Sequence, residues 1–216
     1  MSEPVTLHGY YRSSASFRVR IALNLKGMAY KTIPHHLRRG EQNLPDYRRI
    51  NPQGLVPALE IDGQAFMQSL AIMEYLDETH PDPPLLPKNA AGRARVRALS
   101  QIIACDVHPI DNLRVLTYLR GPLCQPDEVV ARWYNHWIAE GFHALEVSLA
   151  RSRETGRFCH GDTVSLADIC LVPQVVNAMT YALDLSSFPT LKRIADAALA
   201  LPAFEHALPA NQEDAE

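Results

Sequence analysis

Residues 10–17 read YYRSSASF and combine an arginine and several hydroxyl groups with the expected start of a helix. An alternating apolar run, Val5 to Tyr10, precedes the serines, and apolar residues at helical spacing follow as far as Gly27. The N–H groups and the dipole at a helix start favour negative charge, so Ser13 and Ser14 are placed to hold an anion. Disulfide exchange would need two cysteines here, and the serines exclude it. The alternative is that both serines only cap the helix.

Two other junctions carry residues that suit a peptide ligand. Val56-Pro57 precedes an apolar run, and a proline entering a strand is often cis, which leaves the Val56 backbone free to pair with an extended peptide. Gln68-Ser69 precedes the next helical pattern, so we expect Ser69 to cap that helix and to offer its hydroxyl and N–H to a carboxylate. Together with the paired serines, these junctions indicate a glutathione site.

The elements that must position these junctions alternate between strand and helix. Period-two patterns predict strands over residues 5–10, 30–33, 56–61 and 65–68, and helical spacing predicts helices that end at Gly27 and that begin at Ser69. Asp62-Gly63, between the last two strands, is a strong hairpin signal. This order predicts an α/β thioredoxin-like domain with helices layered on a sheet.

Residues 80–87, HPDPPLLP, cannot continue a helix and predict a stiff linker. We therefore expect a thioredoxin-like domain over residues 1–82, a Pro-rich linker over 83–88 and an all-α helical bundle over 89–216, where apolar residues recur every three or four positions. Within the second domain, Ser165 and Asp168 have the spacing of a capping box, which gives Asp168 a structural role. The tail after Pro209 is polar, and we expect it to be frayed.

Composition limits the classes of function. The 216 residues include 21 basic and 24 acidic side chains, a net charge of −3, which predicts no general attraction to nucleic acid or to an anionic membrane. No apolar run approaches the ~20 residues of a membrane span, and residues 1–4 do not resemble a secretory signal, so we expect a cytoplasmic protein. The cysteines have no metal or disulfide spacing and are expected to be reduced, with no metal bound: Cys105, Cys124, Cys159 and Cys170.

Residues 13–23, SSASFRVRIAL, resemble the SSCSWRVRIAL signature of the zeta-class glutathione transferases, the family of maleylacetoacetate isomerase and its maleylpyruvate-isomerising relatives. Further segments resemble family landmarks in family order and extend the likeness over nearly the whole chain: Asn51-Pro52, Val56-Pro57, residues 68–72, residues 85–87 and residues 168–175. The resemblance implies the cytosolic glutathione transferase architecture, glutathione as cofactor and a homodimer.

The resemblance also implies roles for single residues. Ser13 and Ser14 would face the glutathione sulfur, with Ser13 the better candidate. The remaining glutathione contacts would come from the backbone of Val56 before Pro57, from Gln68 and Ser69 at the γ-glutamyl end, and from Gln42 at the glycyl end. His108, Asn112 and Arg114 would serve the substrate side or the site of a partner subunit. Independently of the resemblance, an anionic substrate needs cationic donors, and Arg12 and Arg114 are the candidates; the alternative is that each lies on the surface or pairs with an acidic side chain. Arg18 and Arg20 are expected to be structural or solvated.

The implied reaction is the glutathione-dependent cis-trans isomerisation of a maleyl keto acid, above all maleylacetoacetate to fumarylacetoacetate in the breakdown of tyrosine and phenylalanine. The alternatives are isomerisation of maleylpyruvate, glutathione transfer to or dehalogenation of small α-halo acids, and a binding protein without turnover. Two departures leave the small anionic substrate open. Ala15 replaces the family cysteine, which disfavours reductive dehalogenation, and Thr180 stands where relatives carry an arginine for a substrate carboxylate.

Overall fold

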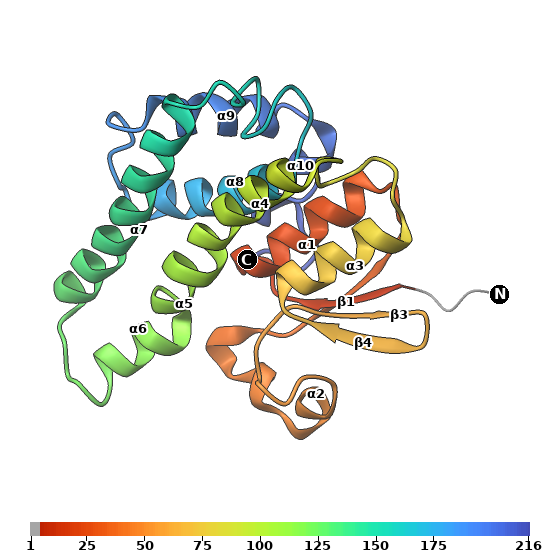
Figure 1. Ribbon diagram of the computed structural model, residues 1–216. Coiled ribbons are helices and arrows are strands. Elements are labelled where there is room, and N and C mark those ends of the chain that lie inside the picture. Colours follow the sequence, from red (N-terminus) through yellow and green to blue (C-terminus); the bar gives the residue numbers. More distant parts are fainter. Residues whose placement is uncertain (1–4) are drawn as a thin grey trace. The chain divides into compact units, whose positions relative to one another are not determined.

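The computed structural model describes residues 5–216 and divides the chain into two compact units (Figure 1). The first unit runs up to Leu85 and also includes Ala200–Glu216, and the second comprises Leu86–Leu199.

The first unit is built on a four-stranded mixed sheet with the strand order β2-β1-β3-β4. Its strands are β1 (Thr6–Gly9), β2 (Lys31–Pro34), β3 (Ala58–Ile61) and β4 (Gln64–Met67). β1 runs parallel to β2 and antiparallel to β3, which pairs with β4. The β3–β4 hairpin turns at Asp62 and Gly63, whose φ angles of 52° and 70° are those the predicted tight turn requires.

Two helices of this unit, α1 (Ser14–Leu25) and α3 (Ser69–Thr79), lie side by side on one face of the sheet (Figure 1). Every residue of α1 from Ser14 to Leu23 is buried, because α10 (Pro202–Glu205) also packs against this helix. α1 ends just before Gly27, as its apolar spacing predicts, and Gly27 has the positive φ of a helix stop.

The connection from β2 to β3 holds three short helices: η1 (Leu37–Arg39), η2 (Glu41–Asn43) and α2 (Pro45–Ile50). The Tyr47 ring of α2 packs on the His35 ring at a centroid distance of 4.1 Å, and the Tyr47 hydroxyl donates to the carbonyl of Leu55 at 2.6 Å. These contacts fix α2 and the chain that leads to Val56-Pro57. The Val56–Pro57 peptide is cis.

The second unit is helical, as predicted. Its helices are α4 (Ala90–Gln101), the π-helical η3 (Ile102–Val107), α5 (His108–Ile110), α6 (Leu113–Arg120), α7 (Asp127–Ala150), α8 (Leu166–Thr180) and α9 (Pro189–Leu199). α8 contacts both α4 and α9 through a largely buried surface. Its N-terminus carries the complete capping box of Ser165 and Asp168, which confirms that part of the sequence analysis.

The C-terminal segment departs from the sequence-based prediction in two ways. Residues 200–216 belong to the first unit and not to the predicted helical domain 89–216, because Phe204 and Ala207 are fully buried against it. The amide of Asn24 also donates to the carbonyl of Ala203 at 3.0 Å. The tail after Pro209 is not frayed, since it forms the 3-10 helix η4 (Pro209–Asn211) and makes further contacts with its own unit.

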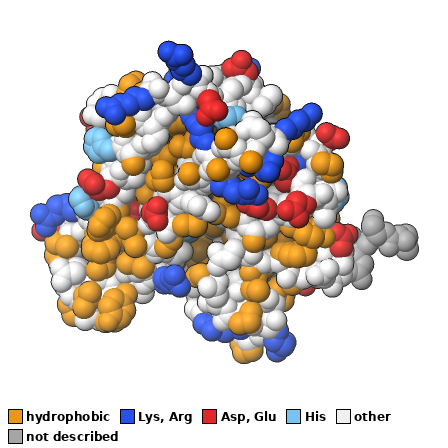
Figure 2. Space-filling view, in the orientation of Figure 1, with side chains coloured by type: hydrophobic (Ala, Val, Ile, Leu, Met, Phe, Trp, Pro, Cys, Tyr) orange, Lys and Arg blue, Asp and Glu red, His pale blue; other side chains and the backbone are white. Residues whose placement is uncertain are grey.

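Within residues 5–216, no helix combines the length and the apolar character of a bilayer span. Over the same range, no group of three His, Cys, Asp or Glu side chains is arranged to hold a metal ion. Figure 2 shows basic and acidic side chains interspersed on the face in view. The four cysteines are free: Cys159 and Cys170 are buried, and Cys105 and Cys124 are exposed.

Candidate active site

The register of the sheet brings the predicted junctions of the first unit together at one end of its strands. His8 of β1 pairs with Ala58 of β3, which in turn pairs with Met67 of β4. The end of β1, the start of β3 and the end of β4 are therefore neighbours. Three chain segments leave or enter the sheet at this end of the strands: residues 10–13, Val56-Pro57 and Gln68-Ser69. The pairing thus places three segments distant in sequence around one site.

Ser13 caps the N-terminus of α1. Its Oγ accepts the N–H of Ser16 at 3.1 Å, and its own N–H donates to the carbonyl of Tyr10 at 2.9 Å. Accepting a bond uses a lone pair and leaves the hydroxyl hydrogen, which Ser13 donates to no group within residues 5–216. The first turn of α1 contains no acidic side chain. The helix dipole and the hydroxyl can therefore act together on an external anion.

The neighbours of Ser13 differ in exposure. Ser14 is only 5% exposed and Ala15 is buried, whereas Ser13 is half-buried and Arg12 is exposed. The Arg12 guanidinium forms no ion pair within residues 5–216. Of the two serines, Ser13 is thus the more accessible to a ligand.

Val56 and Gln42 offer unused polar groups. Val56 is half-buried, and its backbone forms no hydrogen bond within residues 5–216, since β3 begins only at Ala58. Gln42 lies in η2, and its buried Oε1 has no hydrogen-bond partner in the same range. A buried amide oxygen without a donor is costly, so a side-chain rotation that brings Oε1 to an N–H donor would be favoured.

Gln68 and Ser69 differ from the prediction in one respect. Gln68, with a φ of 70°, occupies the N-cap position of α3, and Ser69 is the first helical residue, so Ser69 does not cap this helix. The Ser69 Oγ instead accepts from Nη1 of Arg18 at 3.2 Å, which ties α3 to α1. The exposed Gln68 amide donates to Gln53 at 2.7 Å. The Ser69 N–H is one of the helix-start N–H groups of α3.

The second-unit candidates gather in the connection between η3 and α6. His108 begins α5, and Asn112 caps α6 by accepting the N–H of Arg114 at 3.1 Å. The Arg114 side chain is exposed. Thr180 is the last residue of α8, and its hydroxyl donates to the carbonyl of Val176 at 2.9 Å. Because threonine is uncharged, this position supplies no positive charge.

Two buried polar residues of the first unit, Arg20 and His8, make contacts near these junctions that the sequence did not predict. Arg20 is 2% exposed and holds three backbone carbonyls, so it is structural and not solvated. His8 is buried, with Nδ1 2.9 Å from Nε2 of His35 and Nε2 3.0 Å from Glu60. Burial lowers the pKa of His35. The sequence did offer one sign that Arg20 is buried, because its charge stands inside an apolar helical pattern. The sequence around His8 carried no such sign.

Comparison with known proteins agrees with this geometry. Residues 7–84 match the family described as glutathione S-transferase, N-terminal domain. A probable maleylacetoacetate isomerase of Vibrio cholerae is 52% identical over 212 residues, 97% of each chain. The chain belongs to the maleylacetoacetate isomerase family of zeta-class glutathione transferases.

Solved structures of the family share the fold over 98% of this chain. The holo structure of a bacterial zeta-class maleylpyruvate isomerase has a TM-score of 0.96 at 44% identity, covering 98% of this chain and all of that one. A maleylacetoacetate isomerase of Methylobacterium extorquens with bound malonate and glutathione has a TM-score of 0.95 at 45% identity, covering 98% and 99% of the two chains. Relatives of nearly equal similarity are thus named for two different substrates, maleylpyruvate and maleylacetoacetate.

Proposed function

We propose that the protein is a glutathione-dependent cis-trans isomerase of a maleyl keto acid, and that its substrate is maleylacetoacetate, which it converts to fumarylacetoacetate. The observation that carries this proposal is the N-terminus of α1, where the half-buried Ser13 keeps a hydroxyl hydrogen beside an acid-free first turn. The family relationship supports both the cofactor and the reaction, since relatives bear these names and a similar structure holds glutathione.

The residues present fit glutathione. The free backbone of Val56 suits the cysteinyl part, and the Gln42 amide would contact the glycyl end. Gln68 and Ser69, at the start of α3, would hold the γ-glutamyl group, where helix N–H donors favour a carboxylate. When bound, glutathione would supply a thiolate nucleophile for reversible addition to the cis double bond, and it would be recovered unchanged.

The task of Ser13 is to keep that thiol ionised near neutral pH. Lowering a thiol pKa from about 8.5 to about 6.5 requires roughly 2.7 kcal/mol of preferential thiolate stabilisation. A hydrogen bond to a charged group contributes about 1.5 to 3 kcal/mol, and a helix N-terminus about 0.3 to 1 kcal/mol. The Ser13 hydroxyl and the first turn of α1 together therefore suffice. The buried Ser14 lies next to Ser13 as the first residue of α1.

The substrate side requires cations, because the maleyl keto acid carries carboxylates and its keto oxygen gains negative charge in the reaction. An arginine fork binds a carboxylate through two parallel hydrogen bonds. We assign this role to the exposed guanidinium groups of Arg12 and Arg114, with His108 as a further substrate contact and Asn112 as a glutathione contact.

Two other substrate classes are alternatives. Maleylpyruvate is the first, because a structurally similar relative is a maleylpyruvate isomerase. Small α-halo acids are the second, as substrates of glutathione transfer or of hydrolytic dehalogenation, because Thr180 supplies no cation for a second carboxylate. Ala15 disfavours reductive dehalogenation, since it removes the thiol that would take part in exchange.

We also propose a cytoplasmic homodimer that acts in the catabolism of aromatic amino acids. The family relationship supports this proposal, and sedimentation analysis of the purified protein tests the dimer. A sedimentation coefficient that fits a 24.1 kDa monomer at micromolar concentration would contradict it.

The decisive experiment is an assay with maleylacetoacetate and, separately, with maleylpyruvate, each with and without catalytic glutathione. Chromatography should detect the fumaryl product only with glutathione present, and glutathione should be recovered intact. The ratio of kcat/KM ranks the two substrates. Absence of a trans product from both would refute the isomerase, and a thioether or a dehalogenated product from an α-halo acid would establish the alternative.

A further inference from the structure

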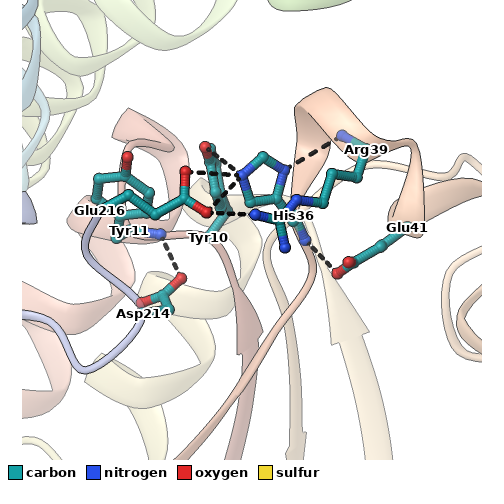
Figure 3. Close-up of polar contacts among 7 residues, drawn as sticks. All are labelled: Tyr10, Tyr11, His36, Arg39, Glu41, Asp214 and Glu216. Carbon is teal, nitrogen blue, oxygen red and sulfur yellow. Dashed lines mark hydrogen bonds and ion pairs between the residues drawn. The ribbon is translucent and has the colours of Figure 1, made fainter.

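The C-terminal segment of the first unit returns to the loop that carries Arg12 and Ser13. The Tyr11 N–H donates to Oδ2 of Asp214 at 3.0 Å, across 203 positions of sequence (Figure 3). Tyr11 is 8% exposed, so this backbone donor would lack a partner if the carboxylate were absent. Asp214 therefore fixes a peptide group two residues before Ser13.

Arg20 holds the same peptide segment from its carbonyl side. Its Nη2 donates to the carbonyl of Tyr11 at 3.1 Å and its Nη1 to the carbonyl of Tyr10 at 3.5 Å. The Tyr10 carbonyl also accepts the N–H of Ser13 at 2.9 Å. The Nε of Arg20 donates to the carbonyl of Ala207 at 3.0 Å. One buried guanidinium thus connects the turn at Ser13 with the C-terminal segment.

The last residue connects the same segment with the η1–η2 region. The Glu216 carboxylate lies 2.7 Å from Nη2 of Arg39 and 3.3 Å from Nε2 of His36, and His36 also lies 3.5 Å from the Tyr10 hydroxyl (Figure 3). Arg39 ends η1, directly before the helix that carries Gln42. The tail therefore contacts both the thiol-side loop and the chain that leads to the glycyl-side candidate.

A carboxylate near this loop would by its charge alone disfavour a thiolate and an anionic substrate. The same negative charge is favourable for Arg20. Burial lowers the pKa of Arg20 to about 10, and the charge of Asp214 opposes this lowering and so favours the charged guanidinium. The geometry gives Asp214 a task that outweighs the unfavourable charge, namely acceptance of the Tyr11 N–H.

We propose that Asp214 is a positioning residue for the thiol site, which acts with Arg20 to hold the Tyr10–Tyr11 peptides so that Ser13 and Arg12 face the bound thiol and the substrate. The C-terminal segment is then part of the working site. This proposal rests on the proposed function, because the thiol is that of glutathione.

The test compares Asp214→Ala, Asp214→Asn and the control Glu213→Ala, which changes an exposed neighbouring carboxylate that forms no ion pair within residues 5–216. Asparagine keeps an oxygen acceptor for the Tyr11 N–H and removes the charge. For each variant, the ultraviolet absorbance of the bound thiolate is titrated against pH, and kcat and the glutathione KM are measured with the better keto acid.

Asp214→Ala should raise the pKa of the bound thiol by about one unit and lower kcat about tenfold, with the glutathione KM changed less than about threefold. Asp214→Asn should stay within about threefold of the wild type in kcat, and Glu213→Ala should not differ from it. Amide hydrogen exchange of the Tyr10–Ser13 segment should accelerate in Asp214→Ala alone, which checks the mechanism in a folded protein.

Two results would overturn the proposal. In the first, Asp214→Ala matches Glu213→Ala in thiol pKa and kcat. In the second, Asp214→Ala and Asp214→Asn both lower the thiol pKa, as removal of a mere negative charge would do. The thiol titration needs only glutathione binding. A wild-type protein that binds and ionises glutathione without isomerising either keto acid would therefore refute the proposed function alone, and the same variants would still test Asp214.

Discussion

Two serines, Ser13 and Ser165, cap the N-termini of α1 and α8 and have opposite surroundings. The Ser165 hydroxyl donates to Oδ2 of Asp168 at 2.8 Å, and Asp168 also accepts the Ser165 N–H and the N–H of Cys159, each at 2.8 Å. All of this polar capacity is used inside the protein. Ser13 accepts one helix N–H and keeps its hydroxyl hydrogen, and no acidic side chain neutralises the first turn of α1.

The difference separates a helix start that serves folding from one that serves chemistry. A closed capping box satisfies the free N–H groups of a helix and leaves nothing for a ligand. An open cap with a half-exposed hydroxyl leaves the positive end of the helix for an external anion. Mutations at the two caps should therefore affect different quantities: the free energy of unfolding at α8 and turnover at α1.

The largest effect is expected for Asp168→Ala. Asp168 is fully buried, and its loss would leave the N–H groups of Cys159 and Ser165 without their acceptor. We expect the free energy of unfolding to fall by about 3 kcal/mol and Tm to fall by about 10 °C. Urea and thermal unfolding measure this loss. The control, Asp196→Ala, removes a surface ion pair with Lys192 and should cost less than about 1 kcal/mol; an equal cost would contradict the closed-cap interpretation.

Ser13→Ala should break the open cap. The thiolate would lose its hydroxyl donor, so kcat should fall at least about tenfold and the pKa of the bound thiol should rise by about one unit, with little change in glutathione affinity. Steady-state kinetics and thiol titration provide both values. Ser148→Ala, at an exposed serine of α7, is the matched control. Near-normal turnover of Ser13→Ala would transfer the role to Ser14 or to the backbone of α1.

Asp111 is a second buried carboxylate, and it lacks the hydrogen-bond donors that Asp168 has. Neither of its oxygens has a partner within residues 5–216, and burial raises the pKa of Asp111 from its ordinary 3.8 to about 8. Between these values the folded state keeps a proton that the unfolded state has released. The contribution of Asp111 to stability is therefore present below about pH 4 and is lost as the pH rises towards 8.

Asp111→Asn removes this ionisation. We expect the variant to exceed the wild type in stability at pH 8 and to show a smaller decrease in stability from pH 5 to pH 8. Urea unfolding at the two pH values measures both quantities. A wild type and variant with the same pH dependence would show that Asp111 is already ionised in the folded protein.

The smallest effect is expected for Arg114→Ala. Its guanidinium is exposed, so the lost contact with a substrate carboxylate should raise the substrate KM about three- to fivefold, with kcat and glutathione affinity little changed. Arg132→Ala, which removes an exposed arginine of α7, controls for net charge. An unchanged KM would place Arg114 outside the substrate site.

Features whose partners lie within a few residues were predictable. The hairpin at Asp62-Gly63, the end of α1 at Gly27 and the box of Ser165 and Asp168 depend on local backbone preferences and short hydrogen bonds. The α/β order was predictable for the same reason, because each strand or helix has its own apolar period. The cap of α3 was missed, since Gln68 takes the N-cap position through a positive φ that its residue type does not favour.

The sequence by itself determined the two-part architecture, the serine at the start of α1 and the family to which the chain belongs. Only the tertiary structure decided that residues 200–216 join the first unit, that Arg20 is an anchor for three carbonyls, and that Asp214 holds Tyr11. The physical reason is that a charged residue in a polar tail has the same local pattern whether it is solvated or paired. Its partner, 203 positions away, becomes its neighbour only when the chain folds.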